Sequence, residues 1–326
     1  MSGARPVVGF IGIGVMGAPM TMSLLRAGYR IIVSDLRADA ASEQIAAGAQ
    51  WANTAAETAA RSDVVFTCLP SLEAIETATV GPSGILEGMR EGGACFETST
   101  NSIGLLKKLN EAFLKKGCHL LDAPISGGAL GAKRGRMAFW VGGNRAVFSR
   151  FKPVLKAMGD KPTYVGAIGA GLVTKLVHNS ASQAMQAALA EVFVLGVKAG
   201  AEPLALWKAI RQGSIGRRRT FDGLADEFLP ANFDPPHASL EIVEKDLKLA
   251  TELGRELRVP MRIANLALAD ILEAMNRGWG GRDARSVMLL PQERAGVSIK
   301  VDPELVRDVF VEDPPAPSDA KHGDGA

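Results

Sequence analysis

The sequence is poor in cysteine, in tyrosine and in uninterrupted apolar runs. It holds three cysteines and two tyrosines among 326 residues. Three scattered thiols offer neither a disulfide framework nor the paired ligands of a zinc site, which indicates a reduced, cytoplasmic chain. The longest apolar stretch, residues 172–197, is interrupted by Lys175, Gln183, Gln186 and Glu191, so it is too polar to span a membrane.

Neither sign of charge dominates. The chain has 37 Lys and Arg against 35 Asp and Glu, a formal net charge of +2. This balance gives no reason to expect nucleic acid or an anionic membrane as a partner. No residue pattern suggests a metal site or a Ser/His/Asp triad. The 47% hydrophobic content is that of a globular protein, and the length favours two domains.

Short apolar runs alternate with helical patterns in the first half of the chain. The runs are nearly continuous in apolar residues, as in parallel strands buried on both faces. The expected strands are Val7–Ile11, Ile31–Ser34, Val64–Leu69, Ala94–Phe96, Cys118–Leu121, Met137–Val141 and Thr163–Val165. The expected helices include Ala18–Ala27, Ala41–Ala47 and Ile103–Lys116. Repeated βα units predict an α/β, Rossmann-like domain over residues 1–168, with a doubly wound, mostly parallel sheet.

After residue 169 the pattern becomes helical. Alanine-rich segments with few β-branched clusters predict an all-α domain over residues 169–299. Its first helix, expected at 170–199, has small residues that suit close packing, within the domain or against a second subunit. Residues 300–326 are expected to be a largely disordered tail, because prolines and polar residues fill the positions after about 312.

A glycine-rich loop follows the first expected strand. In Gly12-Ile13-Gly14-Val15-Met16-Gly17, Gly12 allows the tight turn and Gly14 lets the backbone approach a pyrophosphate. Gly17 allows close packing of the following helix, whose amino end attracts phosphate. The strand and helix on either side make this more than a structural turn.

An acidic residue closes the second expected strand. Asp35 lies 23 residues after Gly12, where a carboxylate can accept hydrogen bonds from both ribose hydroxyls of a dinucleotide. The same charge repels a 2′-phosphate, so NAD is favoured over NADP. Arg37 lies close enough to keep NADP as an alternative.

One lysine stands behind this dinucleotide-binding unit. Lys175 lies in an apolar helical segment, and Asn179 follows one helical turn later on the same face. Oxidation of an alcohol by hydride transfer needs a base for the hydroxyl proton, and burial lowers the pKa of a lysine towards that task. An exposed structural lysine is the alternative, but the neighbours Leu172 and Leu176 are apolar.

A Ser-Gly-Gly turn precedes the lysine. The glycines of Ser126-Gly127-Gly128 allow backbone N–H groups to converge on an anion, and the serine adds a hydroxyl donor. A carboxylate group is the ligand expected at this turn. A flexible surface turn is the alternative.

Taken in order, these motifs resemble the β-hydroxyacid dehydrogenase family, typified by 3-hydroxyisobutyrate dehydrogenase and tartronate semialdehyde reductase. The resemblance extends from about residue 7 to 299. It rests on Gly9–Met20, on Asp122–Ala132, on Gly169, Gly171, Lys175 and Asn179, and on Lys245–Leu247. It implies transfer of a hydride between NAD(H) and a small β-hydroxy acid or its semialdehyde, with a lysine as general acid and base.

The resemblance also implies roles for single residues. Lys175 is similar to the family's catalytic lysine, and the family's Asp-x-Ser-Thr turn reads Glu97-Thr98-Ser99-Thr100 here. The residues expected to bind substrate are Ser126, Gly127, Gly128, Asn179, Asp246 and Thr100. Those expected to bind the cofactor are Gly12, Ile13, Gly14, Val15, Met16, Gly17, Asp35, Leu69, Pro70, Ser99 and Lys245.

Several departures from the family pattern bear on the substrate. A Phe that the family often has eight residues before Asp246 is Ala238 here, which predicts a roomier pocket and a substrate larger than 3-hydroxyisobutyrate. Arg217-Arg218-Arg219 stands where the family often has one arginine. It can bind a second acidic group, face another subunit or lie in solvent. The roles of Arg136 and His237 are also open.

Two other functions stay open beside the dehydrogenase. One is an imine or semialdehyde reductase that uses NADPH, although imine reductases usually lack the lysine. The other is a non-catalytic NAD-binding relative, against which Lys175, Asn179 and Asp246 argue. The expected partner is a small carboxylate-bearing substrate, with neither nucleic acid nor membrane. The expected assembly is a homodimer or homotetramer.

Overall fold

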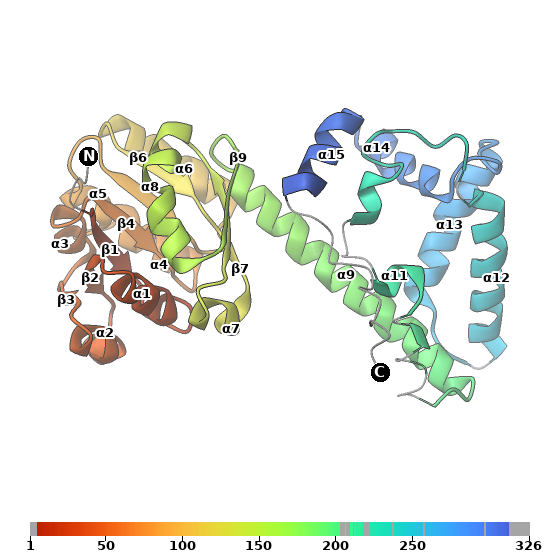
Figure 1. Ribbon diagram of the computed structural model, residues 1–326, viewed down its shortest axis with the longest axis horizontal. Coiled ribbons are helices and arrows are strands. Elements are labelled where there is room, and N and C mark those ends of the chain that lie inside the picture. The colour runs from red at the N-terminus through yellow and green to blue at the C-terminus, as the bar shows by residue number, and fades with distance from the viewer. Residues whose placement is uncertain are drawn as a thin grey trace, which may run out of the picture. The chain divides into compact units, whose positions relative to one another are not determined.

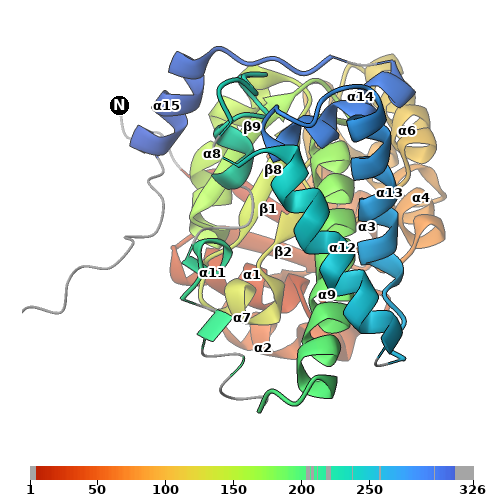
Figure 2. The same cartoon turned by 90° about the vertical axis from the view of Figure 1, so that its right-hand side faces the viewer.

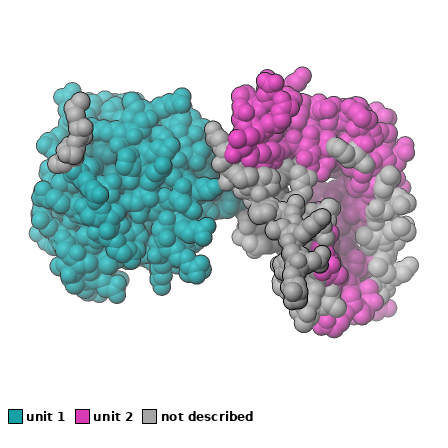
Figure 3. Space-filling view, in the orientation of Figure 1, with its two compact units in different colours: residues 1–181 teal, residues 182–326 magenta. Residues whose placement is uncertain are grey.

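The chain divides into two compact units, Met1–Ala181 and Ser182–Ala326 (Figure 3). The structure is a computed structural model and describes residues 5–202, 206, 209–210, 212–217, 222–236, 238–256, 258–296 and 298–312. Each unit has a hydrophobic core of its own.

Strands and helices alternate through the first unit. The strands are β1 (Val7–Ile11), β2 (Arg30–Ser34), β3 (Gln50–Trp51), β4 (Val64–Thr67), β5 (Ala94–Glu97), β6 (His119–Asp122), β7 (Ile125–Ser126), β8 (Ala138–Gly142) and β9 (Lys161–Gly166). The helices are α1 (Gly17–Arg26), the 3-10 helix η1 (Ala38–Ala41), α2 (Ser42–Ala46), α3 (Ala55–Ala60), α4 (Leu72–Val80), α5 (Ile85–Gly88), α6 (Ile103–Lys115), α7 (Gly128–Lys133) and α8 (Arg145–Met158).

These strands form one nine-stranded, mostly parallel sheet with helices on both faces (Figure 1). The strand order is β3-β2-β1-β4-β5-β6-β8-β7, with β9 beside β8. Strands β1 to β6 run parallel, whereas β8 is antiparallel to β6 and β7. The order reverses between β1 and β4, and sheets of this kind bind ligands at that switch point, beyond the carboxyl ends of the strands.

Two apolar cores lie on the two faces of the sheet. One joins the strands to α1 and α8 through a row of rings, Phe10, Phe66, Phe96 and Phe151, with successive centroids 6.2, 5.0 and 6.1 Å apart. The other joins the strands to α3, α4, α5 and α6. Leu172 belongs to this second core, so the residues around it are anchored in the first unit.

The second unit is helical in its described residues. The long helix α9 (Ala170–Lys198) begins in the first unit and ends in the second. After it come α11 (Ser214–Arg217), η2 (Asp222–Ala225), α12 (Leu240–Glu256), α13 (Arg262–Asn276), η3 (Ala284–Met288), α14 (Leu289–Ala295) and α15 (Pro303–Glu312). Helices α12 and α13 lie side by side (Figures 1 and 2) and share a small core that includes Leu240, Ile271 and Leu290.

The expected strands are all present, with ends shifted by at most two residues. The short strands β3 and β7 and the helices α3, α4, α5 and α7 were not predicted. Helix α15 occupies residues 303–312 of the segment expected as a tail, because Pro303 opens it and Asp302 Oδ1 accepts the N–H of Glu304 at 2.8 Å. Residues 313–326 lie outside the described residues. Among the helices described, none has both the length and the apolar character of a membrane span.

Candidate active site

The loop after β1 has the shape that a dinucleotide needs. Gly12 has φ +93°, and a Cβ there would lie 2.3 Å from the carbonyl oxygen of Cys68. A Cβ on Gly17 would lie 1.9 Å from the Gly12 oxygen, so the loop packs against the start of α1. Gly14 differs, because a Cβ there would meet no atom within 4 Å. Its exposed backbone therefore leaves room for a pyrophosphate above the amino end of α1.

Asp35 is tied to this loop. Its Oδ2 accepts the N–H of Ile13 at 2.7 Å, and its Oδ1 accepts the N–H of Arg37 at 3.1 Å. Each oxygen keeps a further lone pair, so the carboxylate can still accept ribose hydroxyls. The Arg37 guanidinium lies 4.0 Å from Asp39 in an exposed pair. If the ribose lies beside this carboxylate, its charge would repel a 2′-phosphate.

The loops after β4 and β5 are bonded to each other at the same edge of the sheet. Ser99 Oγ accepts the N–H of Leu69 at 2.8 Å. The Ser99 N–H is donated to Glu97 Oε1 at 2.9 Å. Pro70 and Thr100 are exposed beside them. The structure thus brings together Leu69, Pro70, Ser99 and Thr100, four of the predicted site residues.

A buried carboxylate caps the helix that carries the lysine. Asp122, 2% exposed, accepts the N–H of Gly169 at Oδ1 and the N–H of Leu172 at Oδ2, both at 2.7 Å. Burial raises the pKa of Asp122, and these backbone bonds oppose the rise. A Cβ on Gly171 would lie 2.1 Å from the oxygen of Trp140, so glycine lets α9 approach the sheet. This capping role accounts for part of the Gly-x-Gly-x-x-x-Lys spacing.

Lys175 lies close to the segment that precedes the Ser-Gly-Gly turn. Its Nζ donates to the carbonyl oxygen of Ile125 at 2.7 Å, one residue before the Ser126-Gly127-Gly128 turn. Burial lowers the pKa of Lys175, with no neighbouring charge among the causes. Asn179 is exposed one turn further along α9, and its Oδ1 lies 3.1 Å from Nδ1 of His178. The structure therefore brings the ammonium group of Lys175 to the carbonyl of Ile125, next to Ser126.

The Ser-Gly-Gly turn connects β7 to α7. Ser126 pairs with Ala138 of β8, which holds the start of the turn on the sheet. Gly127 has φ +139°, a conformation that favours glycine, and Gly127 and Gly128 are exposed. Arg136, beyond α7, is exposed and lies 3.5 Å from Asp160.

The other predicted residues belong to the second unit. Lys245 and Asp246 lie on α12, but their side chains are outside the described part of the chain. Arg218, Arg219 and His237 are likewise outside the described residues, as is the side chain of Arg217. Ala238 is exposed, and its carbonyl accepts the N–H of Ala284 at 2.9 Å.

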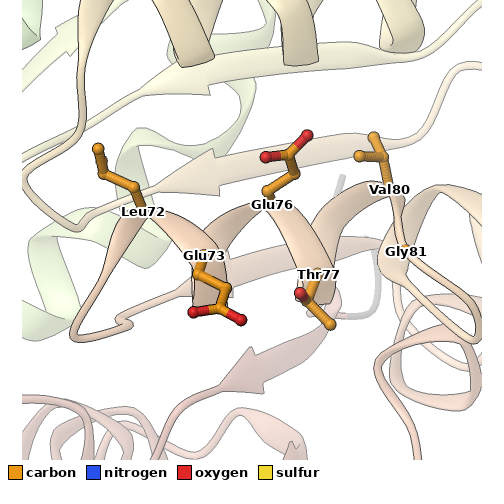
Figure 4. Close-up of a pocket in the computed structure, with 6 residues that line it drawn as sticks. All are labelled: Leu72, Glu73, Glu76, Thr77, Val80 and Gly81. Carbon is orange, nitrogen blue, oxygen red and sulfur yellow. The ribbon is translucent and has the colours of Figure 1, made fainter.

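A surface depression lies apart from the predicted site residues. A depression of about 420 Å³ lies along α4 (Figure 4). It is lined by Leu72, Glu73, Glu76, Thr77, Val80 and Gly81. None of these is a predicted site residue, so the depression is separate from the candidate site. Within the described part of the chain, no group of three or more His, Cys, Asp or Glu side chains could hold a metal ion.

Sequence reasoning missed two buried acids, Asp122 as the cap of α9 and Glu97 as the acceptor behind Ser99. Asp122 opens the Asp122–Ala132 motif and Glu97 opens the Glu97–Thr100 turn, but the sequence assigned neither acid a role of its own. The available signal was an acidic residue at the carboxyl end of an apolar strand, where burial demands donors for it.

Comparisons with known proteins agree with this geometry. Residues 7–166 match the family model of the NAD-binding domain of 6-phosphogluconate dehydrogenase. Residues 169–290 match the NAD-binding model of NADP-dependent 3-hydroxyisobutyrate dehydrogenase. The 2-(hydroxymethyl)glutarate dehydrogenase of Eubacterium barkeri is 34% identical over 292 residues, 90% of this chain and 97% of that protein.

Solved structures extend the comparison. Mycobacterium tuberculosis 3-hydroxyisobutyrate dehydrogenase with L-serine aligns with a TM-score of 0.62 and 29% identity, covering 89% of this chain and 100% of that one. An imine reductase variant of Myxococcus stipitatus with NAD+ has a TM-score of 0.77 at 18% identity, covering 87% of this chain and 99% of that one. At such low identity, the second likeness concerns the fold alone.

Proposed function

The chain belongs to the 3-hydroxyisobutyrate dehydrogenase-like family of NAD(P)-dependent oxidoreductases acting on CH–OH donors, and from this premise we propose how its own residues divide the work. The bound dinucleotide supplies the hydride acceptor in oxidation and the hydride donor in reduction. Lys175 is the general acid and base, and the Ser126-Gly127-Gly128 turn holds the substrate carboxylate.

The position of Lys175 is the observation that carries this proposal. A half-buried ammonium group beside the substrate turn, with a lowered pKa, can lose its proton more readily than an exposed lysine. As a neutral amine, Lys175 accepts the proton from the hydroxyl oxygen while the carbon that bears this hydroxyl gives its hydride to the oxidised dinucleotide. In the reverse direction the ammonium donates that proton to the carbonyl oxygen.

For the cofactor, we propose NAD as the form that the chain prefers. The glycine loop Gly12–Gly17 takes the pyrophosphate, and Asp35 takes the ribose hydroxyls, with Leu69, Pro70 and Ser99 along the other half. NADP is the alternative, and the described contacts of Arg37 give it little support. Lys245 is included as a cofactor-binding residue because it matches the family's cofactor-contacting lysine.

For the substrate, the proposal is a β-hydroxy acid larger than 3-hydroxyisobutyrate. The turn and Asn179 bind its carboxylate, and Thr100 and Asp246 lie near its reacting end. Ala238, in place of a bulky ring, supports a larger pocket. The similarity to 2-(hydroxymethyl)glutarate dehydrogenase supports a second carboxylate on the substrate.

The proposed assembly is a homodimer or homotetramer. An exposed apolar strip on α9 supports this assembly, because a second subunit could cover it. The strip consists of Val173, Leu176 and Val177. A cytoplasmic location is proposed because Cys68, Cys95 and Cys118 are free thiols.

The test is NADH formation from NAD+ with a panel of hydroxy acids at alkaline pH, run beside NADPH oxidation with a panel of imines. Turnover of β-hydroxy acids, with larger or dicarboxylic members preferred, is the expected result. Turnover restricted to imines would favour the reductase alternative. Cofactor binding without any turnover would favour a non-catalytic relative.

A further inference from the structure

A buried carboxyl group lies behind the proposed cofactor loops. Glu97, at the end of β5, is 2% exposed. Its Oε1 accepts the Thr67 hydroxyl at 3.1 Å and the Ser99 N–H at 2.9 Å. The side-chain amide of Asn101 donates to Oε2 at 3.5 Å. All three partners are donors, so the arrangement suits the ionised carboxylate.

This carboxylate joins two loops. Ser99, whose N–H bonds to Glu97, accepts the N–H of Leu69 at its own hydroxyl oxygen at 2.8 Å. Leu69 follows β4 and Ser99 follows β5, so a single buried acid holds both loops in one arrangement. A protonated Glu97 would lose acceptor strength at each of these bonds.

Glu97 is the group in this cluster whose charge can change near neutral pH. Burial raises the pKa of Glu97 to about 7. The thiols nearest to it belong to Cys68, with a pKa raised to about 11, and to Cys95, with a pKa raised well above its usual range. Both are neutral at pH 7. Asp122 of β6 is paired in register with Glu97, and its oxygens accept α9 amides.

The cofactor half that faces these loops follows from the sheet order. Asp35, beyond β2, is the proposed acceptor for the adenosine ribose hydroxyls. A dinucleotide lies across the switch point between the two halves of the sheet, so its second nucleotide lies towards β4 and β5. That nucleotide carries a positively charged ring when oxidised and a neutral ring when reduced.

We propose that Glu97 is a positioning residue that holds the loops 68–70 and 99–101 together, and that its negative charge makes the site favour NAD+ over NADH. The inference rests on the proposed cofactor site. Linkage requires the converse as well: NAD+ binding favours the ionised acid and releases a proton near neutral pH, whereas NADH binding does not. Protonation of Glu97 therefore shifts the site towards the reduced cofactor.

The experiment measures dissociation constants of NAD+ and NADH for the full chain at about pH 5.5 and about pH 8.5. Titration calorimetry in two buffers of different ionisation enthalpy reports the proton release directly. For the wild-type protein we expect the ratio of the NADH constant to the NAD+ constant to rise by about three- to tenfold from the lower to the higher pH. Glu97→Gln should flatten that rise, because it cannot ionise.

Two further variants complete the test. Glu97→Asp keeps a charge and should retain most of the pH-dependent rise, and Glu111→Gln, exposed on α6, should behave as the wild type. A purely structural Glu97 would change both constants equally in Glu97→Gln and leave their ratio dependent on pH as before, which overturns the inference. Equal ratios at both pH values in the wild type also overturn it. If the protein binds neither dinucleotide, the cofactor assignment itself is contradicted, and this inference is contradicted with it.

Discussion

The carboxylate of Asp122 accepts the backbone N–H of Leu172 at 2.7 Å, across 50 residues of sequence. This bond joins the end of β6, which leads into the substrate turn, to the first turn of the helix that carries Lys175. The lysine in turn donates to Ile125 in the segment that follows β6. The substrate turn and the proposed proton carrier are thus held by one short stretch of chain.

Replacing Asp122 by Asn should weaken this cap. The amide offers one acceptor oxygen where the carboxylate offers two, so one of the two backbone N–H groups faces an NH₂ group. We expect a loss of about 1–3 kcal/mol in the free energy of unfolding, measured by denaturant titration, and a lower kcat. Asp160→Asn, at a partly exposed pair with Arg136, is the control and should change little. Equal stability of the Asp122 variant and the wild type would contradict the capping role.

Two glycines of the proposed cofactor loop, Gly14 and Gly17, should respond differently to alanine. A methyl group on Gly14 meets no protein atom within 4 Å, so Gly14→Ala should fold normally and bind NAD+ at least about tenfold more weakly, by occupying the space for the pyrophosphate. Gly17→Ala places its methyl group 1.9 Å from the Gly12 oxygen and should lower the melting temperature. Fluorescence titration and thermal unfolding measure the two effects. Undiminished NAD+ binding by Gly14→Ala would place the cofactor elsewhere.

Asp35 should set the choice between NAD and NADP. Asp35→Ser removes the charge that repels a 2′-phosphate, so the ratio of kcat/KM for NAD+ to that for NADP+ should fall by about tenfold or more. The bond from Ile13 is also weakened, and some loss of activity with NAD+ is expected. Glu43→Gln, at an exposed residue of α2, should leave the ratio unchanged. A ratio that does not move in Asp35→Ser would exclude Asp35 from the ribose site.

The buried acid Glu97 should make stability depend on pH. Its pKa rises from 4.5 to about 7 on folding, so the folded chain binds this proton more tightly than the unfolded chain. The free energy of unfolding therefore falls as pH rises from about 4.5 to 7, by about 3 kcal/mol from this group. In Glu97→Gln that component of the fall should disappear, as measured by denaturant titration at several pH values. Parallel curves for the variant and the wild type would show that Glu97 has no raised pKa.

Much of the first unit could be predicted from sequence, because buried parallel strands are short, apolar and regularly spaced. The glycine loop and Asp35 also carry local patterns that reflect backbone geometry. Helix α3 was missed although its signal was present. Thr54 accepts the N–H of Glu57, and Glu57 accepts the N–H of Asn53, one residue before the cap. This is a variant of the capping box, and the sequence Thr-x-x-Glu could have indicated it.

The bonds that shape the site could not be predicted. Asp122 meets Gly169 across 47 residues, and Ser99 meets Leu69 across 30, so no local pattern encodes either contact. These hydrogen bonds can be expected only once the burial of the acids is known, because a buried carboxylate needs hydrogen-bond donors. Lys175 was recognised by its motif, whereas its bond to the carbonyl of Ile125 depends on how α9 docks on the sheet.

The most direct measurement of the central claim is the pH dependence of kcat/KM for β-hydroxy acid oxidation by the wild type, Lys175→Met and Lys107→Met. Burial lowers the pKa of Lys175, and oxidation needs its neutral form, so the wild-type rate should rise with pH through that lowered pKa. Lys107 is exposed on α6, and its variant should follow the wild type. Lys175→Met should lose at least about a hundredfold in kcat while still binding NAD+. Full activity in Lys175→Met, with the wild-type pH profile, would contradict the account.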